Sequence, residues 1–333
     1  MAEHKKTYSE RTDEELENLA FFPIKNPEIE HWYQKQKEAF WTAQHIDYTN
    51  DRNDWNSLDT NTKHYIKHLL FLFAQLDGIV NENLVENFEK ETSVFAKECS
   101  MFYAVQKMME WTHNETYSLL IKTFIQDTKE QEIGLNSIKN FPAIRAIADW
   151  AFSKMDSEIP LLERIVAFAC IEGVIFSSAF AGIYWIKRRN ILHALTKANE
   201  WIARDEGIHF NFGITLYHQI TSVWKKSERL SQEKIYSIIG DAVAVTERFT
   251  RDAMNVHLVG LDADDMMQYV RCTADNLIKG LNYTPLYNAP NPYDWMLLIS
   301  IPNKTNYFES RVTEYSTSTG GGIEWDKVDT QEF

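Results

Sequence analysis

The 22-residue stretch IVAFACIEGVIFSSAFAGIYWI, residues 165–186, limits the possible folds of this 333-residue chain more than any other feature. It carries a single charged residue, Glu172, so it has no polar face to turn toward water. Its length would cross a bilayer. No second stretch of similar purity is present, however, and the net charge of the chain is −14. We therefore expect the central helix of a bundle, apolar on every side, and no membrane span.

The rest of the sequence predicts an all-α protein. Apolar residues recur with helical periodicity, and no convincing set of alternating strands is present. With only 12 Gly and 8 Pro, long helices are favoured over a turn-rich β fold. Asn26 and Pro27 supply the cap and the first position of one helix. The expected helices cover residues 27–46, 61–91, 95–127, 129–154, 161–189, 192–220, 230–257 and 261–281.

Both ends of the chain differ from this helical body. Residues 1–20 are charged and lack the apolar core of a signal peptide. Residues 316–333, STSTGGGIEWDKVDTQEF, are rich in Ser, Thr and Gly and then acidic, so they can bury little surface. We expect flexible segments at 1–20 and 316–333 and one helical domain over 21–315.

The motif Glu-x-x-His occurs three times in the chain. It places a carboxylate and an imidazole on adjacent turns of a helix, where both can reach one metal ion. With 29 Glu and 10 His, about one such pair is expected by chance. We take Glu28–His31, in a polar turn near the N-terminus, as the chance instance. The other two pairs, Glu110–His113 and Glu206–His209, lie in largely apolar helices.

Two isolated acids share this apolar setting, Asp77 in LLFLFAQLDGIV and Glu172 in AFACIEGVIFSSAF. Taken singly, either could be a buried carboxylate held by a nearby cation or backbone donor. Together with the two Glu-x-x-His pairs they form the ligand pattern of ferritin-like di-metal bundles, with Asp in place of one Glu. Four carboxylates and two imidazoles suit two iron or manganese ions better than a structural zinc ion.

Longer segments extend this pattern over most of the chain between about residues 20 and 315. With them the chain resembles the small, radical-generating subunit of class I ribonucleotide reductase. The resemblance implies a ferritin-like bundle, an oxidoreductase of deoxyribonucleotide synthesis and a homodimer. The segments are FFPIKNPEIEHWY, FWTAQHID, LDGIVNENLVENF, EWTHNETYSLL, ERIVAFACIEGVIFSSAFAGIYWIKRR, NEWIARDEGIHFNF, NPYDWM and KTNYFESRVTEY.

The resemblance also assigns roles within the metal site. Glu110 and Glu206 would bridge two iron ions, although manganese stays open as the active metal. The ligand set that it implies is Asp77, Glu110 and His113 for one ion, and Glu172, Glu206 and His209 for the other.

Tyr117 corresponds to the tyrosine that carries the radical in this family. It lies one helical turn beyond His113 on the same face, in agreement with the geometry of the helix. Phe176, Phe180 and Ile202 match the apolar residues around that tyrosine, and a dry apolar shell would protect a radical. Without the metal ligands, all four would be ordinary core residues.

Other residues match the family's path of radical transfer. Trp41 corresponds to the electron-relay tryptophan, and Asp205 to the acid that links it to a ligand histidine. Such a carboxylate commonly orients a metal-bound histidine. Tyr315 matches the tyrosine that passes the radical toward the partner, and Arg204 stands at the position of a family arginine. A core tryptophan and a surface aspartate are the alternatives for Trp41 and Asp205.

The implied partner is a separate large subunit, which binds the substrate and receives the C-terminal tail. The tail ending in WDKVDTQEF differs in sequence from that of the relatives, so the identity of that subunit stays open. The chain itself has no GxxxxGK[ST] or GxGxxG loop for a nucleotide. Its negative charge disfavours nucleic-acid binding. Three cysteines without a CxxC pair indicate free thiols in a reducing, cytoplasmic compartment.

Two other functions are compatible with parts of the pattern. A stand-alone ferritin-like oxidase or oxygenase would explain the metal ligands, but not Tyr117, Trp41 and Tyr315 together. A metal-free scaffold that only stabilises a partner would leave the ligands themselves unexplained.

Overall fold

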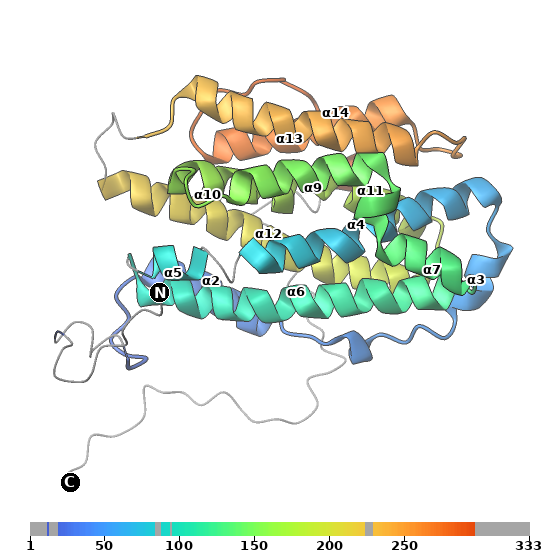
Figure 1. Ribbon diagram of the computed structural model, residues 1–333, viewed down its shortest axis with the longest axis horizontal. Coiled ribbons are helices and arrows are strands. Elements are labelled where there is room, and N and C mark those ends of the chain that lie inside the picture. Colours follow the sequence, from blue (N-terminus) through green and yellow to red (C-terminus); the bar gives the residue numbers. More distant parts are fainter. Residues whose placement is uncertain (1–11, 13–18, 84–87, 94, 224–228, 297–333) are drawn as a thin grey trace, which may run out of the picture. The chain divides into compact units, whose positions relative to one another are not determined.

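The computed structural model describes residue 12 and residues 19–83, 88–93, 95–223 and 229–296, and within these ranges it contains helices and no strand. The predicted all-α fold is thus confirmed (Figure 1). One compact unit ends at Pro292, and residues 293–333 form a second. The helices are α2 (Pro27–Glu38), α3 (Asp51–Ser57), α4 (Thr60–Asn83), α5 (Glu89–Thr92), α6 (Lys97–Phe124), α7 (Thr128–Leu135), α8 (Ser137–Asn140), α9 (Pro142–Met155), α10 (Leu161–Cys170), α11 (Ser177–Arg188), α12 (His193–Val223), α13 (Gln232–Ala253) and α14 (Ala263–Gly280), with short helical turns η2 (Ala43–His45), η4 (Ile171–Ile175) and η6 (Asp294–Met296).

The long apolar run forms a helix in the interior of the first unit. It comprises α10, the π-helical turn η4 and α11, and it packs against α12, α13 and α14. Leu161–Arg188 is long and apolar enough to cross a membrane, but 94% of its most apolar window is buried inside the protein. The prediction of a core helix is therefore confirmed, since neighbouring helices cover the surface that lipid would otherwise meet.

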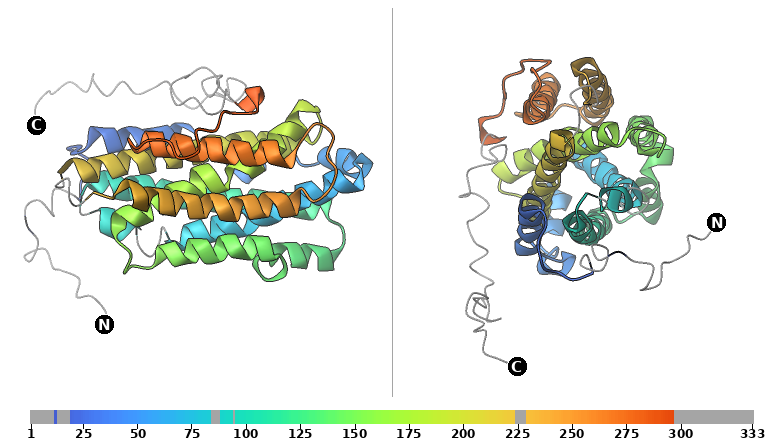
Figure 2. Two further views of the ribbon diagram at one scale, coloured as in Figure 1. Left: turned by 90° about the horizontal axis from the view of Figure 1, so that it is seen from above. Right: turned by 90° about the vertical axis from the view of Figure 1, so that its left-hand side faces the viewer.

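Four helices surround the interior at the level of the candidate ligands. α4 packs along α6, and α12 contacts α6, α10 and α11. Viewed end-on, these long helices run along a common direction (Figure 2). Helices α4, α6 and α12 each contribute at least one of the acids singled out in the sequence, and Glu172 comes from η4, between α10 and α11. The four-helix arrangement inferred from the isolated acids and the Glu-x-x-His pairs is thus present.

The start of α12 is fixed by a buried acid outside the predicted helices. The Asp51 carboxylate is 1% exposed and accepts hydrogen bonds from the backbone N–H groups of Ala194 (2.9 Å) and Leu195 (2.8 Å). These donors lie in the first turn of α12 and have no partner within the helix. Helix α3, which carries Asp51, was not predicted, because its seven residues show no clear apolar period.

The expected helix over 27–46 is wrong beyond Glu38. Asn26 caps α2 as predicted, accepting a hydrogen bond from the N–H of Ile29, and Pro27 stands at the first position. The chain then leaves the helix, and residues 40–42 are not helical. This change of direction puts Trp41 in the core, 3% exposed. Tertiary packing of the indole therefore takes precedence over helical propensity here.

The expected helix over 129–154 is broken into α7, α8 and α9. Pro142 disfavours helical geometry at Phe141 and cannot donate a backbone hydrogen bond, so α9 begins with this proline. Within the expected helix over 61–91, the described residues form α4 up to Asn83 and α5 from Glu89. After α14 the chain forms an ordered loop, in which Asp275 accepts hydrogen bonds from the backbone of Leu286, Tyr287 and Ala289.

Candidate metal centre

The six predicted ligands come from four helices and are all buried, each at most 3% exposed. Helix α4 supplies one acid and the π-helical turn another. Helices α6 and α12 each supply a Glu-x-x-His pair. Such a concentration of ionisable groups in a core is costly unless opposite charges compensate for it. The residues are Asp77, Glu110, His113, Glu172, Glu206 and His209.

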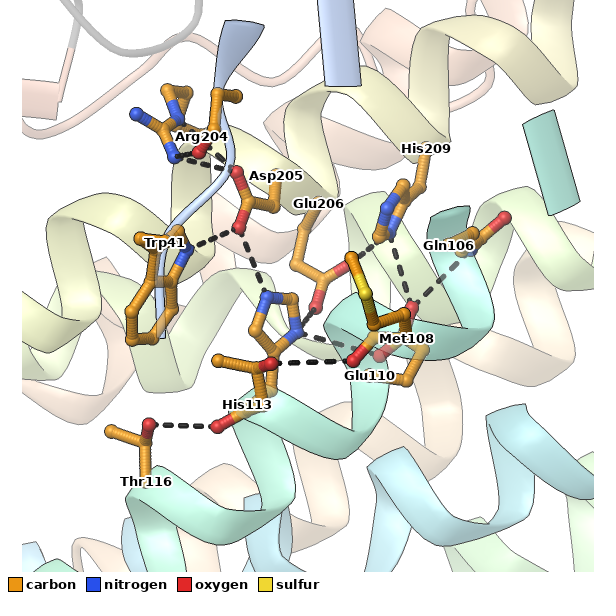
Figure 3. A network of polar contacts seen from close by, with 12 residues as sticks. Trp41, Gln106, Met108, Glu110, His113, Thr116, Arg204, Asp205, Glu206 and His209 are labelled. Atoms are coloured by element: carbon orange, nitrogen blue, oxygen red, sulfur yellow. Dashed lines mark hydrogen bonds and ion pairs between the residues drawn. The ribbon is translucent and has the colours of Figure 1, made fainter. Parts of the chain in front are cut away.

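Four of these residues lie close enough together to bind one ion. Glu110, Glu172, Glu206 and His209 each offer a ligand atom, and these atoms lie within 4.8 Å of one another. His209 Nδ1 is 2.7 Å from Glu206 Oε2 and 3.1 Å from Glu110 Oε1. His113 Nδ1 is 3.0 Å from Glu206 Oε1 and 3.4 Å from Glu110 Oε2. Both imidazoles thus face the same two carboxylates, Glu110 and Glu206 (Figure 3).

Asp77 is buried beside this cluster, 1% exposed. Neither of its carboxylate oxygens has a hydrogen-bond partner among the described residues. Burial raises the pKa of Asp77 well above its usual value, and the charge of Glu110 adds to this effect. An orphaned carboxylate next to other carboxylates is what a cation site offers before its cation binds. The donor set therefore fits divalent metal ions.

Burial and neighbouring charges shift the pKa values of the other acids and imidazoles in different directions. Burial, followed by the charge of Glu206, raises the pKa of Glu172. Burial would also raise the pKa of Glu206, but His209 and His113 lower it. The pKa of His209 is raised to about 9, because the carboxylate of Glu206 outweighs the opposing effect of burial. Protons on the imidazoles thus balance part of the negative charge that two divalent ions would balance.

Gln106 is a member of the site that the sequence reasoning missed. It is fully buried in α6, and its Nε2 donates to Glu172 Oε1 (3.1 Å) and Glu110 Oε1 (3.3 Å). Its position four residues before Glu110, on the same helical face, is the signal that could have found it. Glu172 lies in the π-helical turn, a distortion often found at functional sites. Gln106 thus restrains a carboxylate on an irregular piece of helix.

Tyr117 lies in a dry aromatic pocket next to the ligands. It is fully buried, and its hydroxyl has no hydrogen-bond partner among the described residues. Burial, followed by the charge of Asp77, raises the pKa of its phenol well above 10. Phe73 lies parallel to the Tyr117 ring, with 4.4 Å between centroids, and contacts both Phe176 (5.2 Å) and Phe180 (5.1 Å). Ile202 is also fully buried.

Phe73 was another omission of the sequence reasoning. It stands four residues before Asp77 on α4, so the same helical face carries both side chains. It contacts Tyr117 directly and links that ring to the two phenylalanines that were predicted. One face of the tyrosine is thereby covered by the ring of Phe73.

A hydrogen-bonded path leads from His113 to Trp41. The Asp205 Oδ2 atom is 3.1 Å from His113 Nε2 and accepts a hydrogen bond of 2.7 Å from the indole N–H of Trp41 (Figure 3). The Arg204 guanidinium donates to Asp205 Oδ1 and to the backbone carbonyl of Ala39. Burial opposes ionisation of Asp205, but Arg204 and His113 lower its pKa. Trp41, Asp205 and His113 therefore form one network, with Asp205 in the linking position that the resemblance implies.

The Glu28–His31 pair lies outside this centre. Glu28 and His31 are both exposed, and Glu28 accepts a hydrogen bond from Gln219, as expected for a surface pair. Tyr315 lies outside the described residues, as do residues 316–333, so their predicted roles stay predictions.

Comparison with known proteins gives one consistent result. The family model described as ribonucleotide reductase, small chain, matches residues 18–292. The protein is 40% identical over 303 residues to the ribonucleoside-diphosphate reductase small chain of Nicotiana tabacum, covering 91% of its own length and 90% of the tobacco protein. It is 43% identical over 294 residues to the small chain of Spisula solidissima, covering 88% and 74%.

Solved structures agree at the level of the fold. The Rnr4 homodimer of the Saccharomyces cerevisiae ribonucleotide reductase is 30% identical, with a TM-score of 0.72, and the match covers 83% of this chain and 85% of the yeast chain. The dimanganese(II)-NrdF protein of Streptococcus sanguinis is 19% identical with a TM-score of 0.72, covering 85% and 98%.

Proposed function

Because this chain belongs to the ribonucleotide reductase small-chain family, we propose that its metal centre generates a radical on Tyr117 for use by a separate large subunit. The large subunit then reduces ribonucleoside diphosphates to deoxyribonucleoside diphosphates. The observation that carries the proposal is the placement of Tyr117, fully buried and one helical turn beyond His113, at the edge of a cluster of metal-ligating side chains. A stand-alone oxidase needs the ligands but has no use for this tyrosine.

Iron is the metal we propose, two ions per chain. Asp77, Glu110 and His113 would hold one ion, and Glu172, Glu206 and His209 the other. An oxygen-rich set with two imidazoles suits iron, and also manganese. Ferrous iron in this site would reduce O2 and provide the one-electron oxidant for Tyr117.

The protein's own groups prepare Tyr117 for this reaction. Burial raises the pKa of the Tyr117 phenol further above the neutral range, so the ring keeps its proton until it is oxidised. Phe73 covers one face of the ring, and the complete burial of Tyr117 excludes water and small reductants. Asp205 holds His113 in one orientation and provides the contact with Trp41.

A spectroscopic experiment tests the proposal directly. The metal-free chain is given ferrous iron and oxygen, and its electron paramagnetic resonance spectrum is recorded together with its metal content. We expect two ions per chain and a tyrosyl signal. The Tyr117→Phe variant should load metal normally, because Phe preserves the shape, but give no tyrosyl signal. A persistent wild-type signal would show that another of the 15 tyrosines carries the radical.

The large subunit is proposed to bind the C-terminal tail. Residues 316–333 contain Ile323, Trp325, Val328 and Phe333 among acids, and a few apolar anchors can supply most of the affinity of a tail for a groove. Deleting residues 325–333 should leave the Tyr117 signal intact and abolish reductase activity. A peptide of the same residues should compete with the intact chain. Full turnover by the truncated chain would mean that the large subunit docks elsewhere on this chain. The proposed role of Tyr315 in passing the radical to that subunit would then lose its support.

A homodimer is the second assembly we propose. Met108 and Trp111 stand three residues apart on α6 and are 46% and 64% exposed, an unusual exposure for large apolar side chains next to a metal site. Light scattering should give the mass of a dimer for the natural chain and of a monomer for Trp111→Glu. Val259→Glu, a change at another exposed apolar residue, is the control and should stay dimeric.

The proposed location is the cytoplasm. Cys99, Cys170 and Cys272 are all free thiols, two of them buried. Free cysteines are the norm in a reducing compartment.

A further inference from the structure

A second indole, that of Trp201, lies against Trp41. The ring centroids of Trp41 and Trp201 are 5.2 Å apart, a closer approach than the 5.9 Å between Trp41 and His113. Trp201 belongs to α12 and is partly exposed, whereas Trp41 is 3% exposed. The chain of rings from His113 through Trp41 thus continues to the protein surface.

We propose that Trp201 is a further member of the relay, through which one electron passes between a one-electron donor or acceptor in solution and Trp41. This inference rests on the proposed role of Trp41. Indoles are oxidisable side chains, and two rings in contact exchange an electron without a bridging atom. When Trp41 has lost an electron, Trp201 supplies one and is restored by a soluble one-electron reductant. No bond is broken, and the Trp41 N–H keeps its hydrogen bond to Asp205.

Charges around the two indoles give this transfer a direction. The ammonium group of Lys197 lies 5.0 Å from the centroid of the Trp201 ring, so a positive charge on that ring is disfavoured. The carboxylate of Asp205 lies 2.7 Å from the indole nitrogen of Trp41, so a positive charge on that ring is favoured. The oxidised state therefore settles on Trp41, and electrons are drawn inward from Trp201.

Neither Lys197 nor Trp201 was singled out in the sequence, although their spacing on α12 could have identified them. Lys197 and Trp201 are four residues apart and thus share one helical face. Trp201 precedes Asp205 by the same spacing, so one face of α12 presents the cation, the indole and the acid in that order. Trp41 approaches this face from a segment more than 150 residues away in the chain.

The test uses photochemical oxidation of the full chain after removal of metal with a chelator. The probe is tris(bipyridine)ruthenium(III), formed by a light flash with a cobalt(III) ammine as electron acceptor. It is too bulky to enter the core, so a buried indole is oxidised faster where an oxidisable surface residue in contact with it relays the electron. Mass spectrometry then measures the oxidised product at Trp41. We expect Trp201→Phe to reduce this product severalfold; an unchanged yield would overturn the proposal.

Two further variants separate electron transfer from packing. Trp201→Tyr keeps an oxidisable ring and should restore most of the product, whereas a yield as low as that of Trp201→Phe would overturn the relay role. Trp32→Phe changes another partly buried tryptophan, which donates to Thr215, and should leave the yield unchanged; an equal loss there would also contradict the proposal. Lys197→Met should raise the yield, and no rise would overturn the directing role of Lys197.

The outcome is independent of metal loading and of Tyr117. If the protein gave no tyrosyl signal with iron and oxygen, the proposed function would fail while the photochemical result stood. If Trp201 proved unnecessary for oxidation of Trp41, the relay would lose only its outer member.

Discussion

The two halves of the metal centre share one sequence motif but differ in what lies behind each histidine. Behind His113, the Nε2 atom meets Asp205, which in turn accepts a hydrogen bond from Trp41. Behind His209, the Nε2 atom has no hydrogen-bond partner among the described residues, and the ring stands edge-on to Phe102 at 6.2 Å. One half is connected toward the surface by polar contacts, and the other is enclosed by rings.

This difference shows that Glu-x-x-His specifies a ligand pair and nothing about its surroundings. Asp205 stands directly before Glu206 in α12, yet it serves the histidine of α6. Phe102 stacks on Phe212 with centroids 3.6 Å apart, so α6 and α12 together close the other half. The same spacing thus supports a relay on one side and insulation on the other, according to the neighbouring helices.

Removing a proposed ligand should have the largest effect, because both halves of the candidate metal centre would then lose metal. Glu206 lies within 3.0 Å of both imidazoles, and His113 supplies the nitrogen on the connected side. In Glu206→Ala or His113→Ala, we expect metal content to fall well below two ions per chain, measured by elemental analysis. Glu28→Ala is the control and should match the natural chain. Full loading of the first two variants would disprove the ligand assignment.

Changing the connected half alone should reduce turnover while leaving the metal in place. Asp205→Asn preserves the shape but removes the charge that orients His113, and such changes typically cost about tenfold to a hundredfold in activity. Reductase assays with a large subunit should show this loss at nearly normal metal content. Glu163→Gln, at a surface ion pair with Lys234, is the matched control. Unchanged turnover in Asp205→Asn would mean that the polar path is not used.

Changing the enclosed half should have a smaller effect, limited to metal affinity. Gln106→Leu removes the donor to Glu172 and Glu110 but keeps the volume roughly constant. We expect affinity to fall by up to about tenfold, because an outer partner of a ligand is lost. Competition with a chelator of known affinity measures the change. A loss of turnover at saturating metal would show that the two halves are not separable in this way.

The smallest effect should be a pH dependence of the metal-free chain. The pKa of His209 is about 9 in the folded chain against 6.5 ordinarily, so its contribution to stability is full below pH 6.5 and is lost as the pH rises through about 9. Asp77 and Glu172 act in the same direction, because their raised pKa values mean that ionisation opposes folding. Calorimetry should therefore show the melting temperature falling over this range.

The metal-loaded chain supplies the control for that measurement. Metal binding requires neutral imidazoles and ionised carboxylates, so the bound ions replace the protons whose loss causes the decline. The fall should be much weaker after loading. An equal fall in both forms would show that groups outside the metal centre control it.

The sequence by itself determined which acids and imidazoles are buried in the core, the all-α class and the face of α6 that carries Tyr117. These follow from local rules. Helical spacing places Glu110, His113 and Tyr117 on one face of the helix, and a lone acid within an apolar run is buried together with its neighbours. The core position of Glu172 followed in the same way from the apolar run around it. Residues a few positions apart on one helix have a fixed relation, whatever the helix packs against.

Only the tertiary structure decided which side chains meet across helices. The contact of Phe73 with Tyr117, the bonds from Gln106 to Glu172 and the end of α2 at Glu38 all depend on how separate elements cross. Helical periodicity gives the direction of a side chain around its own axis, but not the offset or angle of the neighbouring axis. That is why Trp41 could be singled out from the sequence, while its neighbour Trp201 became visible only in the folded chain.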